Sequence, residues 1–484
     1  MQDSKQLELA LKTLAATIFL GVAGDLLLRD VPWGIGFSIY AFVIFAVGAY
    51  LFRSRTVSLG RGVLWVIPPA LLFASLFAWR DSNDLKILNG ISFSLLVGVF
   101  ALRARQGQIG TATLIDYPLR LVERWACFLT DFFDLARLEG NGKLLGQMNL
   151  GKKLASWTGG ALIAAPLLLV FGVLFASSDA VFSHFAMRAV SFDPAEIVSH
   201  LGVFAASVWI VGGFFRRIFH APDSRPDSQL GRIGPKLGIT EITIVLSTLN
   251  ALFLSFVAIQ FRYLFGGAEL VQRTAHLSYA EYARQGFFEL VLAAFLGLVV
   301  VVAGHNLLKK ENRSEWISYA SLSFTLVCLI FVVMASAFTR MQLYVAIYGI
   351  TRERLYVVAI LFWLAFVLSW FCATTLRGRS SKFSAGALAS LLIVVLALNL
   401  LNPDAYIAKL NTSRALKSID ADYLVGLSND AIPQLLKSLP SIPLDAREKV
   451  LSSLQRRKER MDKDDWRSWD LSSETAISEL NRRR

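Results

Sequence analysis

Long apolar runs of about 20 residues, separated by shorter polar segments, dominate the pattern along the chain. A helix of about 20 apolar residues spans the roughly 30 Å hydrocarbon core of a bilayer, where the backbone has to satisfy its own hydrogen bonds. The pattern therefore predicts an all-α fold, a polytopic bundle of about 11 transmembrane helices. The runs lie at residues 9–28, 34–52, 63–79, 85–102, 157–175, 197–215, 241–263, 287–306, 316–338, 355–375 and 384–401.

The first run has a second interpretation. Lys5 and Lys12 precede its apolar core and small residues follow, which is also typical of a secretory signal peptide. We favour an uncleaved span, because the segment "GDLLLRD" continues the apolar run.

Lys and Arg are distributed unequally between alternate loops. If the N-terminus is cytoplasmic, the loops on that side carry 22 Lys and Arg, and the opposite loops carry 10. Cytoplasmic loops of membrane proteins are enriched in these residues. The sequence therefore predicts a cytoplasmic N-terminus and, after an odd number of spans, an extracytoplasmic C-terminus.

Two segments outside the runs have helical patterns. From Pro118, apolar residues including Trp125 and Phe132 share one face of an amphipathic helix, which would either pack at the membrane interface or bind a partner. The polar tail has helical periodicity at 429–439 and 445–461. We expect four parts, namely N-terminal transmembrane helices (1–106), a cytoplasmic amphipathic helix and linker (107–156), a main transmembrane bundle (157–401) and an extracytoplasmic helical domain (402–484).

Composition supports a membrane protein and excludes several other classes. Of the 484 residues, 55% are hydrophobic and 18% are charged, whereas soluble domains usually carry about 25% charged residues. The net charge of +13 is scattered through short loops, so we expect the lipid bilayer as partner and no nucleic acid. Three distant cysteines and five histidines show no metal-binding spacing, and we expect no metal and no cofactor. No soluble-enzyme motif such as GxSxG occurs, which favours a non-catalytic role while leaving catalysis open.

One carboxylate needs an explanation. Glu289 lies about one turn inside the run that follows "YAEYARQGFF". A carboxylate costs roughly 2.5–3.5 kcal/mol at the centre of a bilayer and less near its edge. At helical spacing, Tyr282, Gly286, Glu289 and Ala293 form a small and polar stripe, which is expected to face other helices or a wet cavity.

Arginine and tyrosine side chains are predicted around this carboxylate at the outer ends of four runs. Arginines there could bind an anionic group such as a lipid phosphate or a sugar acid, while Glu289 orients them or moves a proton. The alternative is a set of interhelical ion pairs within an aromatic belt. The candidate substrate-binding residues are Glu289, Arg340, Arg262, Glu281, Arg284, Tyr344, Tyr348 and Arg352.

Several segments in order carry a family resemblance. They are "IQFRYLFGG", "YAEYARQGFFEL", "RMQLYVAIYGITRERLY", "NPDAYIAKLN", "DADYLVGLSNDAIPQLL" and "DWRSWDLSS", within about 240–470. With them the chain resembles a bacterial membrane-protein family catalogued as domain of unknown function 4173, which is related to 4153. The resemblance implies a multi-pass protein of the bacterial inner membrane and implies no reaction, substrate or cofactor.

Three function classes follow. The first, which we favour, binds or transports an anionic or lipid-linked solute through a polar pocket at the outer face. The second is a non-enzymatic sensor, scaffold or assembly factor that docks partners on its outer tail and on its cytoplasmic amphipathic helix. The third is a membrane-embedded enzyme acting on a lipid-linked substrate, with Glu281 and Glu289 as candidate acid and base.

Overall fold

The described part of the protein is built from helices. In the computed structural model, the structure describes residues 2–53, 63–104, 194–219, 237–265, 287–309, 312–413 and 420–482. These residues contain no β-strand, and nine of their helices are long and apolar enough to cross a membrane. A shorter apolar helix covers Leu64–Ala78. The prediction of an all-α, multi-pass membrane protein is confirmed.

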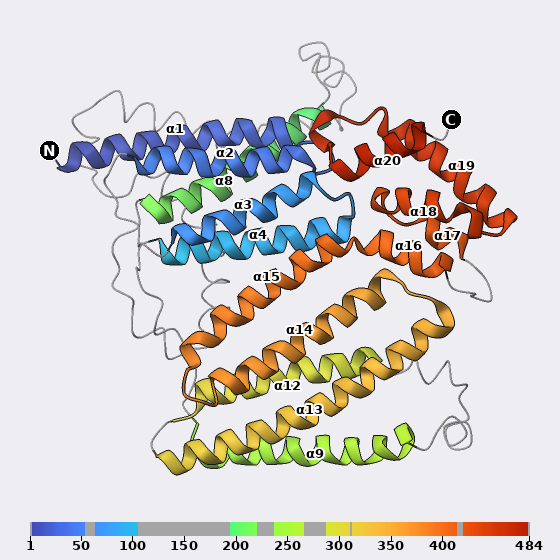
Figure 1. The fold of residues 1–484 in the computed structure, drawn as a ribbon. Helices are drawn as coiled ribbons and strands as arrows, with labels where there is room; N and C mark the ends of the chain where they lie inside the picture. Colours follow the sequence, from blue (N-terminus) through green and yellow to red (C-terminus); the bar gives the residue numbers. More distant parts are fainter. Residues whose placement is uncertain are drawn as a thin grey trace, which may run out of the picture.

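The first of two helix groups forms around the N-terminus (Figure 1). It contains α1 (Gln2–Leu28), α2 (Ile35–Phe52), α3 (Ile67–Ser75), α4 (Asn83–Arg103) and α8 (Pro194–Phe219). Glycines let α1 and α8 approach closely, because a Cβ at Gly21 would lie 2.3 Å from a methyl of Val208. Leu20, Phe73 and Phe215 fill the core of this group.

The second helix group lies beside the first and has its own core. It contains α9 (Ile239–Phe265), α12 (Phe287–Leu307), α13 (Arg313–Tyr348) and α14 (Arg352–Thr374). Buried Tyr319 donates a hydrogen bond of 2.7 Å to the carbonyl oxygen of Val301, which ties α13 to α12. At 1.5 Å per residue, α13 is about 54 Å long and exceeds the roughly 30 Å thickness of a hydrocarbon core.

Helix α15 (Phe383–Leu401) runs diagonally between the two groups (Figure 1). Its Phe383 belongs to the core of the second group, and its Val395 belongs to the core of the first. It therefore shares buried surface with both.

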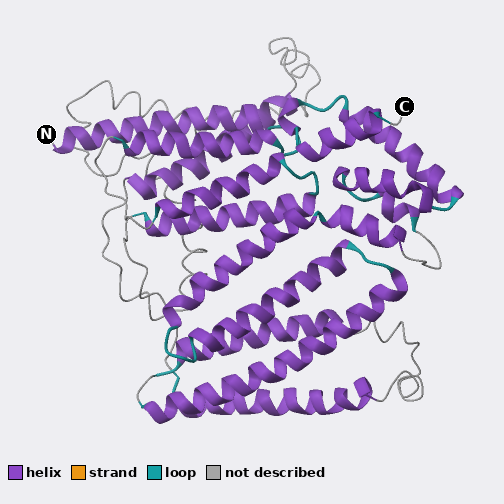
Figure 2. Cartoon of the chain, in the orientation of Figure 1, coloured by secondary structure: helices purple, strands orange, loops and turns teal. Residues whose placement is uncertain are grey.

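The tail continues directly from α15 and forms a third core with the ends of α4, α14 and α15. Figure 2 shows that helices and short connections account for all of its described length. Its helices are α16 (Pro403–Ser413), α17 (Ala421–Val425), α18 (Ile432–Ser438), α19 (Leu444–Met461) and α20 (Leu471–Asn481), with short 3₁₀ turns η5 (Asn429–Ala431) and η7 (Trp466–Ser468).

Each predicted run except 157–175 corresponds to a helical segment. The run 157–175 and the amphipathic helix expected from Pro118 lie outside the described residues. The N-terminus and the tail lie at opposite ends of the bundle (Figure 1). The orientation of the bundle, with the N-terminal end cytoplasmic and the tail extracytoplasmic, stays a prediction.

Candidate functional site

Buried charged residues gather where the tail meets the ends of α4, α14 and α15. Such residues are rarely buried in proteins unless they are paired. Among the described residues, the buried charged side chains are Arg80, Lys86, Asp404, Asp430 and Asp470. They come from both the membrane-spanning part and the tail, so their pairing joins the two.

Asp430, in η5 of the tail, is the most heavily hydrogen-bonded of them. Its carboxylate accepts hydrogen bonds from the backbone N–H groups of Asp81 at 3.0 Å and Ser82 at 2.8 Å. The hydroxyl of Ser472 donates to it at 2.5 Å, and Arg80 pairs with it at 3.3 Å. Asp430 therefore satisfies donors from the start of α4 and from α20 at once.

Asp404, in the first turn of α16, forms the second ion pair. Arg352 of α14 donates two hydrogen bonds to its carboxylate, at 2.7 and 2.6 Å, in the bidentate geometry typical of Arg and carboxylate. The backbone N–H of Ser428 donates a third, at 2.8 Å. Burial raises the pKa of Asp404, but the hydrogen bonds from Arg352 and Ser428 outweigh burial and leave this pKa below its usual value.

Asp470 and Lys86 form a looser buried pair. Asp470 caps α20 by accepting a hydrogen bond of 2.8 Å from the backbone N–H of Ser473. The ammonium of Lys86 lies 3.6 Å from Asp470 and 3.8 Å from Asp81. Burial, with the negative charge of Asp81, raises the pKa of Asp470 to about 6.

A pair of amides lies deeper, between α4 and α15. The side-chain amides of Asn89 and Asn399 donate to each other, at 3.0 and 2.8 Å, and both residues are fully buried. Arg80 joins the pair to the charged cluster by donating to the carbonyl oxygen of Asn399 at 2.9 Å. The polar contacts thus extend from the tail into the bundle.

An apolar groove of about 270 Å³ lies beside this cluster, between α4, α14 and α15. The side chains at its edge include Ile87 and Ile360, which are 61% and 44% exposed. Asp84 lies at its polar end, 44% exposed at the side chain, with one carboxylate oxygen 3.9 Å from Arg352. In the groove wall, Trp363 has a buried indole N–H with no hydrogen-bond partner among the described residues.

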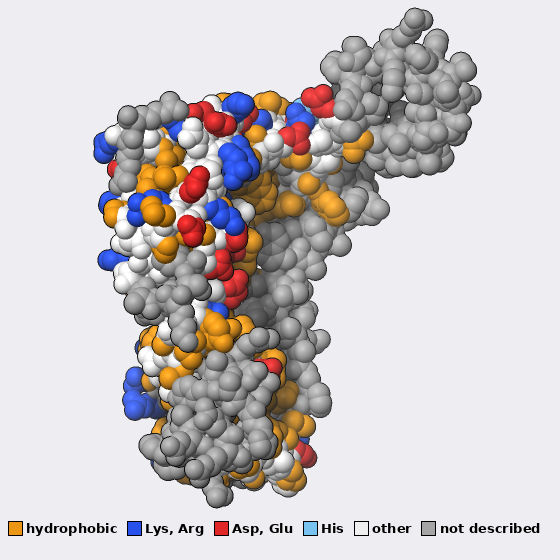
Figure 3. All heavy atoms as spheres, turned by 90° about the vertical axis from the view of Figure 1, so that its right-hand side faces the viewer, with side chains coloured by type: hydrophobic (Ala, Val, Ile, Leu, Met, Phe, Trp, Pro, Cys, Tyr) orange, Lys and Arg blue, Asp and Glu red, His pale blue; other side chains and the backbone are white. Residues whose placement is uncertain are grey.

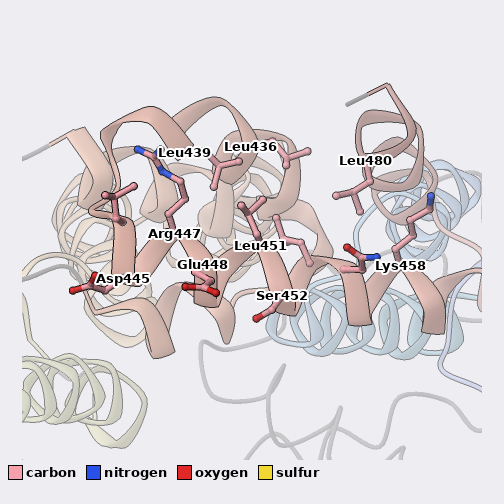
Figure 4. Close-up of a pocket in the computed structure, with 12 residues that line it drawn as sticks. Leu436, Leu439, Asp445, Arg447, Glu448, Leu451, Ser452, Lys458 and Leu480 are labelled. Carbon is pink, nitrogen blue, oxygen red and sulfur yellow. The ribbon is translucent and has the colours of Figure 1, made fainter. Parts of the chain in front are cut away.

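A larger hollow of about 710 Å³ lies on the tail itself, between α18, α19 and α20. Figure 4 shows Leu436, Leu439 and Leu451 directed toward it, with Leu480 at one end. Viewed from the tail end, acidic and basic side chains are interspersed over the described surface (Figure 3). No group of three or more potential metal ligands occurs among the described residues.

The structure distributes the residues predicted around Glu289 over α12, α13 and the charged cluster at the tail. Glu289 lies in the first turn of α12 with an exposed side chain. On α13, the rings of Tyr344 and Tyr348 are 5.0 Å apart, and the guanidinium of Arg354 lies 4.0 Å from the Tyr344 ring. Arg340 also belongs to α13 and is partly buried.

The other four predicted site residues are not described as neighbours of Glu289, Arg340, Tyr344 or Tyr348. The structure places Arg352 with Asp404, in the cluster at the tail. Arg262 belongs to α9, but its side chain is not described, and Glu281 and Arg284 lie outside the described residues. The pocket around Glu289 stays a prediction.

The sequence contained weak signals for the residues that were missed. Arg80, Asp81 and Asp84 belong to "WRDSND", a dense polar stretch in a very short connection between two apolar runs. Asn89 and Asn399 interrupt apolar runs, where an amide needs a partner. Asp430 and Asp470 gave no signal, because surface acids and buried ones look alike in a polar tail.

The chain belongs to a family described as Domain of unknown function (DUF4153), whose model matches residues 67–438. The resemblance to family 4173 is therefore corrected to its relative, 4153. The match extends from α3 to α18, so it includes Arg80, Arg352, Asp404 and Asp430. No curated protein and no solved structure matches the chain.

Proposed function

We propose that this integral membrane protein of the DUF4153 family binds an amphipathic, lipid-like molecule in the groove between α4, α14 and α15. The apolar part of the molecule lies along the groove, and its polar part lies at the tail end beside Asp84. We further propose that this end faces outward from a bacterial inner membrane, as the distribution of Lys and Arg predicts.

The observation that carries the proposal is the groove itself. It is a hollow in membrane-spanning helices, and exposed isoleucines lie at its edge. In a bilayer, exposed apolar side chains on spanning helices face lipid, so a lipid chain can enter sideways.

Polar groups at two depths support an amphipathic ligand. Asp84 is an exposed acceptor at the polar end, suited to a head group that carries hydroxyl or amine donors. The unpartnered indole N–H of Trp363 lies seven residues beyond Tyr356 on α14, about 10 Å deeper at 1.5 Å per residue. If the indole turned toward the groove, an ester or hydroxyl oxygen of a lipid would accept a hydrogen bond from this donor.

The charge at the polar end favours a lipid-linked solute over a simple anion. Asp404 already holds Arg352 in a bidentate pair, so this arginine is not a free anion receptor. A carrier for a lipid-linked solute and a membrane-embedded enzyme would both need a groove that binds a lipid, whereas a scaffold would not.

Filling the groove tests the proposal. Ala359 lines the groove, and we expect Ala359→Trp to abolish the retention of lipid by the purified protein, measured by native mass spectrometry. The matched control is Ala389→Trp, at an exposed position of α15 away from the groove lining. Asp84→Asn, which keeps the shape of the groove, is expected to weaken retention. Equal retention by Ala359→Trp and Ala389→Trp would contradict the proposal.

A further inference from the structure

A second groove lies between α13 and α14, toward the end of the molecule opposite the tail. It has a volume of about 630 Å³, and Phe324, Phe331 and Leu376 contribute to its lining. Phe324 is 54% exposed, and the groove residues on α13 and α14 belong to candidate membrane spans. The groove is therefore open to the acyl-chain region of the bilayer.

A cation lies at its mouth. Arg377 follows the end of α14 at Thr374, has an exposed side chain and lines the groove. Its guanidinium makes no hydrogen bond or ion pair within the described part of the chain. The sequence on both sides of Arg377, residues 354–403, contains no Asp or Glu.

Neighbouring charges have the same sign. Arg379 is exposed, and Lys382 ends the short 3₁₀ turn η4 (Ser380–Lys382) that leads into α15. An apolar slot that ends at Arg377, a cation with no ion pair among the described residues, is complementary to one partner in particular. That partner has an acyl chain and a negatively charged phosphate.

We propose that this groove binds an anionic phospholipid from the leaflet at this end, with its phosphate on Arg377 and an acyl chain between α13 and α14. The site is separate from the groove at the tail end and does not depend on the function proposed for it. The predicted orientation makes this end cytoplasmic, and the cytoplasmic leaflet is where anionic lipids carry the negative surface potential.

The chain carries its own reporters of occupancy. Cys328 and Cys372 both line this groove and are free thiols. A bound acyl chain would cover them and slow their reaction with N-ethylmaleimide, which is uncharged and enters the bilayer. Replacement of Cys127 by Ser leaves these two as the only cysteines of the chain.

The experiment compares three full-length proteins in the Cys127→Ser background, namely the parent, Arg377→Gln and Arg379→Gln. Each is reconstituted in nanodiscs of phosphatidylcholine alone or with phosphatidylglycerol, and the rate of maleimide modification is measured. With phosphatidylglycerol, we expect Arg377→Gln to react several-fold faster than both the parent and Arg379→Gln. In phosphatidylcholine alone, the three rates should agree.

Because all three proteins experience the same bilayer, a general effect of surface charge on thiol reactivity cancels. Equal rates of Arg377→Gln and the parent in phosphatidylglycerol would overturn the proposal. So would an equal acceleration by Arg379→Gln, since that would indicate a diffuse attraction of lipid in place of a site at Arg377.

Discussion

Asp430 has a fully buried carboxylate, and three of its donors, from Arg80, Asp81 and Ser82, lie about 350 residues away in the sequence. Removing one partner of a buried ion pair leaves an uncompensated charge, which makes such pairs sensitive to single substitutions. Asp404 with Arg352 and Asp470 with Lys86 repeat this arrangement at the same interface. Individual residues therefore decide whether the tail stays docked.

The variant Asp430→Asn tests this directly. An amide group would direct donors at Arg80 or at the N–H groups of Asp81 and Ser82, and we expect docking to weaken by about 3–5 kcal/mol. Limited proteolysis of the protein in membranes should show faster cleavage of the tail. The control is Asp422→Asn, because Asp422 pairs with Lys449 on the exposed surface and such pairs contribute little. Equal cleavage of both variants would contradict the structural role of Asp430.

At the scale of single residues, the sequence identified some of the functional candidates but not the residues with which they pair. It identified Arg352 as a polar residue at the end of a span, but placed it in a cluster around Glu289. Its partner Asp404 lies 52 residues away and beyond another span, and no periodicity connects the two. Long-range ion pairs of this kind depend on how helices pack, which a local pattern does not encode.

Among the elements, the contact between η7 and the start of α2 depends on a glycine. The backbone N–H of Ile35 donates to the carbonyl oxygen of Trp469 at 2.9 Å. A Cβ added at Gly34 would lie 2.3 Å from the carbonyl oxygen of Ser468, which is backbone and cannot rotate away. This glycine lets the tail approach α2 closely enough to form the hydrogen bond.

Gly34→Ala is therefore expected to displace η7 and α20 from α2. In Gly48→Ala, the new methyl would meet only a ring carbon of Phe215 at 3.7 Å, an ordinary contact, so this variant should match or exceed the stability of the parent. Hydrogen exchange at the backbone of residues 466–481 measures the difference. Unchanged exchange in Gly34→Ala would show that the contact is dispensable.

The burial of Asp470 beside Asp81 gives the docked tail a pH dependence. The pKa of Asp470 is about 6 in the folded protein and about 3.9 in an unfolded chain, so the folded state binds the proton more tightly. This contribution to stability is fully present below about pH 4 and is lost as the pH rises through about 6. The low pKa of Asp404 acts in the opposite direction, but only at still lower pH.

We therefore expect the thermal unfolding midpoint to be higher at pH 5 than at pH 7.5 in the parent protein. Asp470→Asn should remove most of this difference, because an uncharged cap no longer titrates. Asp422→Asn should keep it. A midpoint that does not respond to pH in the parent would mean that Lys86 stabilises the charged form of Asp470 more strongly than burial opposes it.

The apolar runs predicted the spanning helices well because lipid imposes both their length and their composition. The run 63–79 differs in form, since the structure gives a short α3 with Pro68 and Pro69 at its start and 3₁₀ turns on both sides. In the tail, the start of α16 was missed. Asn402 ends α15 in a left-handed conformation at φ 54°, and α16 begins directly after it without the polar linker that usually separates helices.

For the whole molecule, the tail joins two helix groups that otherwise share mainly α15. Ser428 shows this most clearly, because its backbone N–H donates to Asp404 and its hydroxyl donates to Asp430. Asp404 is paired with α14 of the second group, and Asp430 is bonded to the start of α4 in the first. The proposed lipid groove lies between the same helices, so the tail holds together the walls of that groove.

The most direct test of the central proposal is a photochemical cross-link from inside the groove. A photoreactive benzoyl-phenylalanine placed at Ile87, at the groove edge, would be activated in native membranes, and the adducts would be identified by mass spectrometry. The control position is Ile393 of α15, which is 65% exposed and does not line the groove. We expect one class of lipid-like molecule to be enriched at Ile87 relative to Ile393. Adducts at both positions in the proportions of the bulk membrane lipids would contradict a selective site.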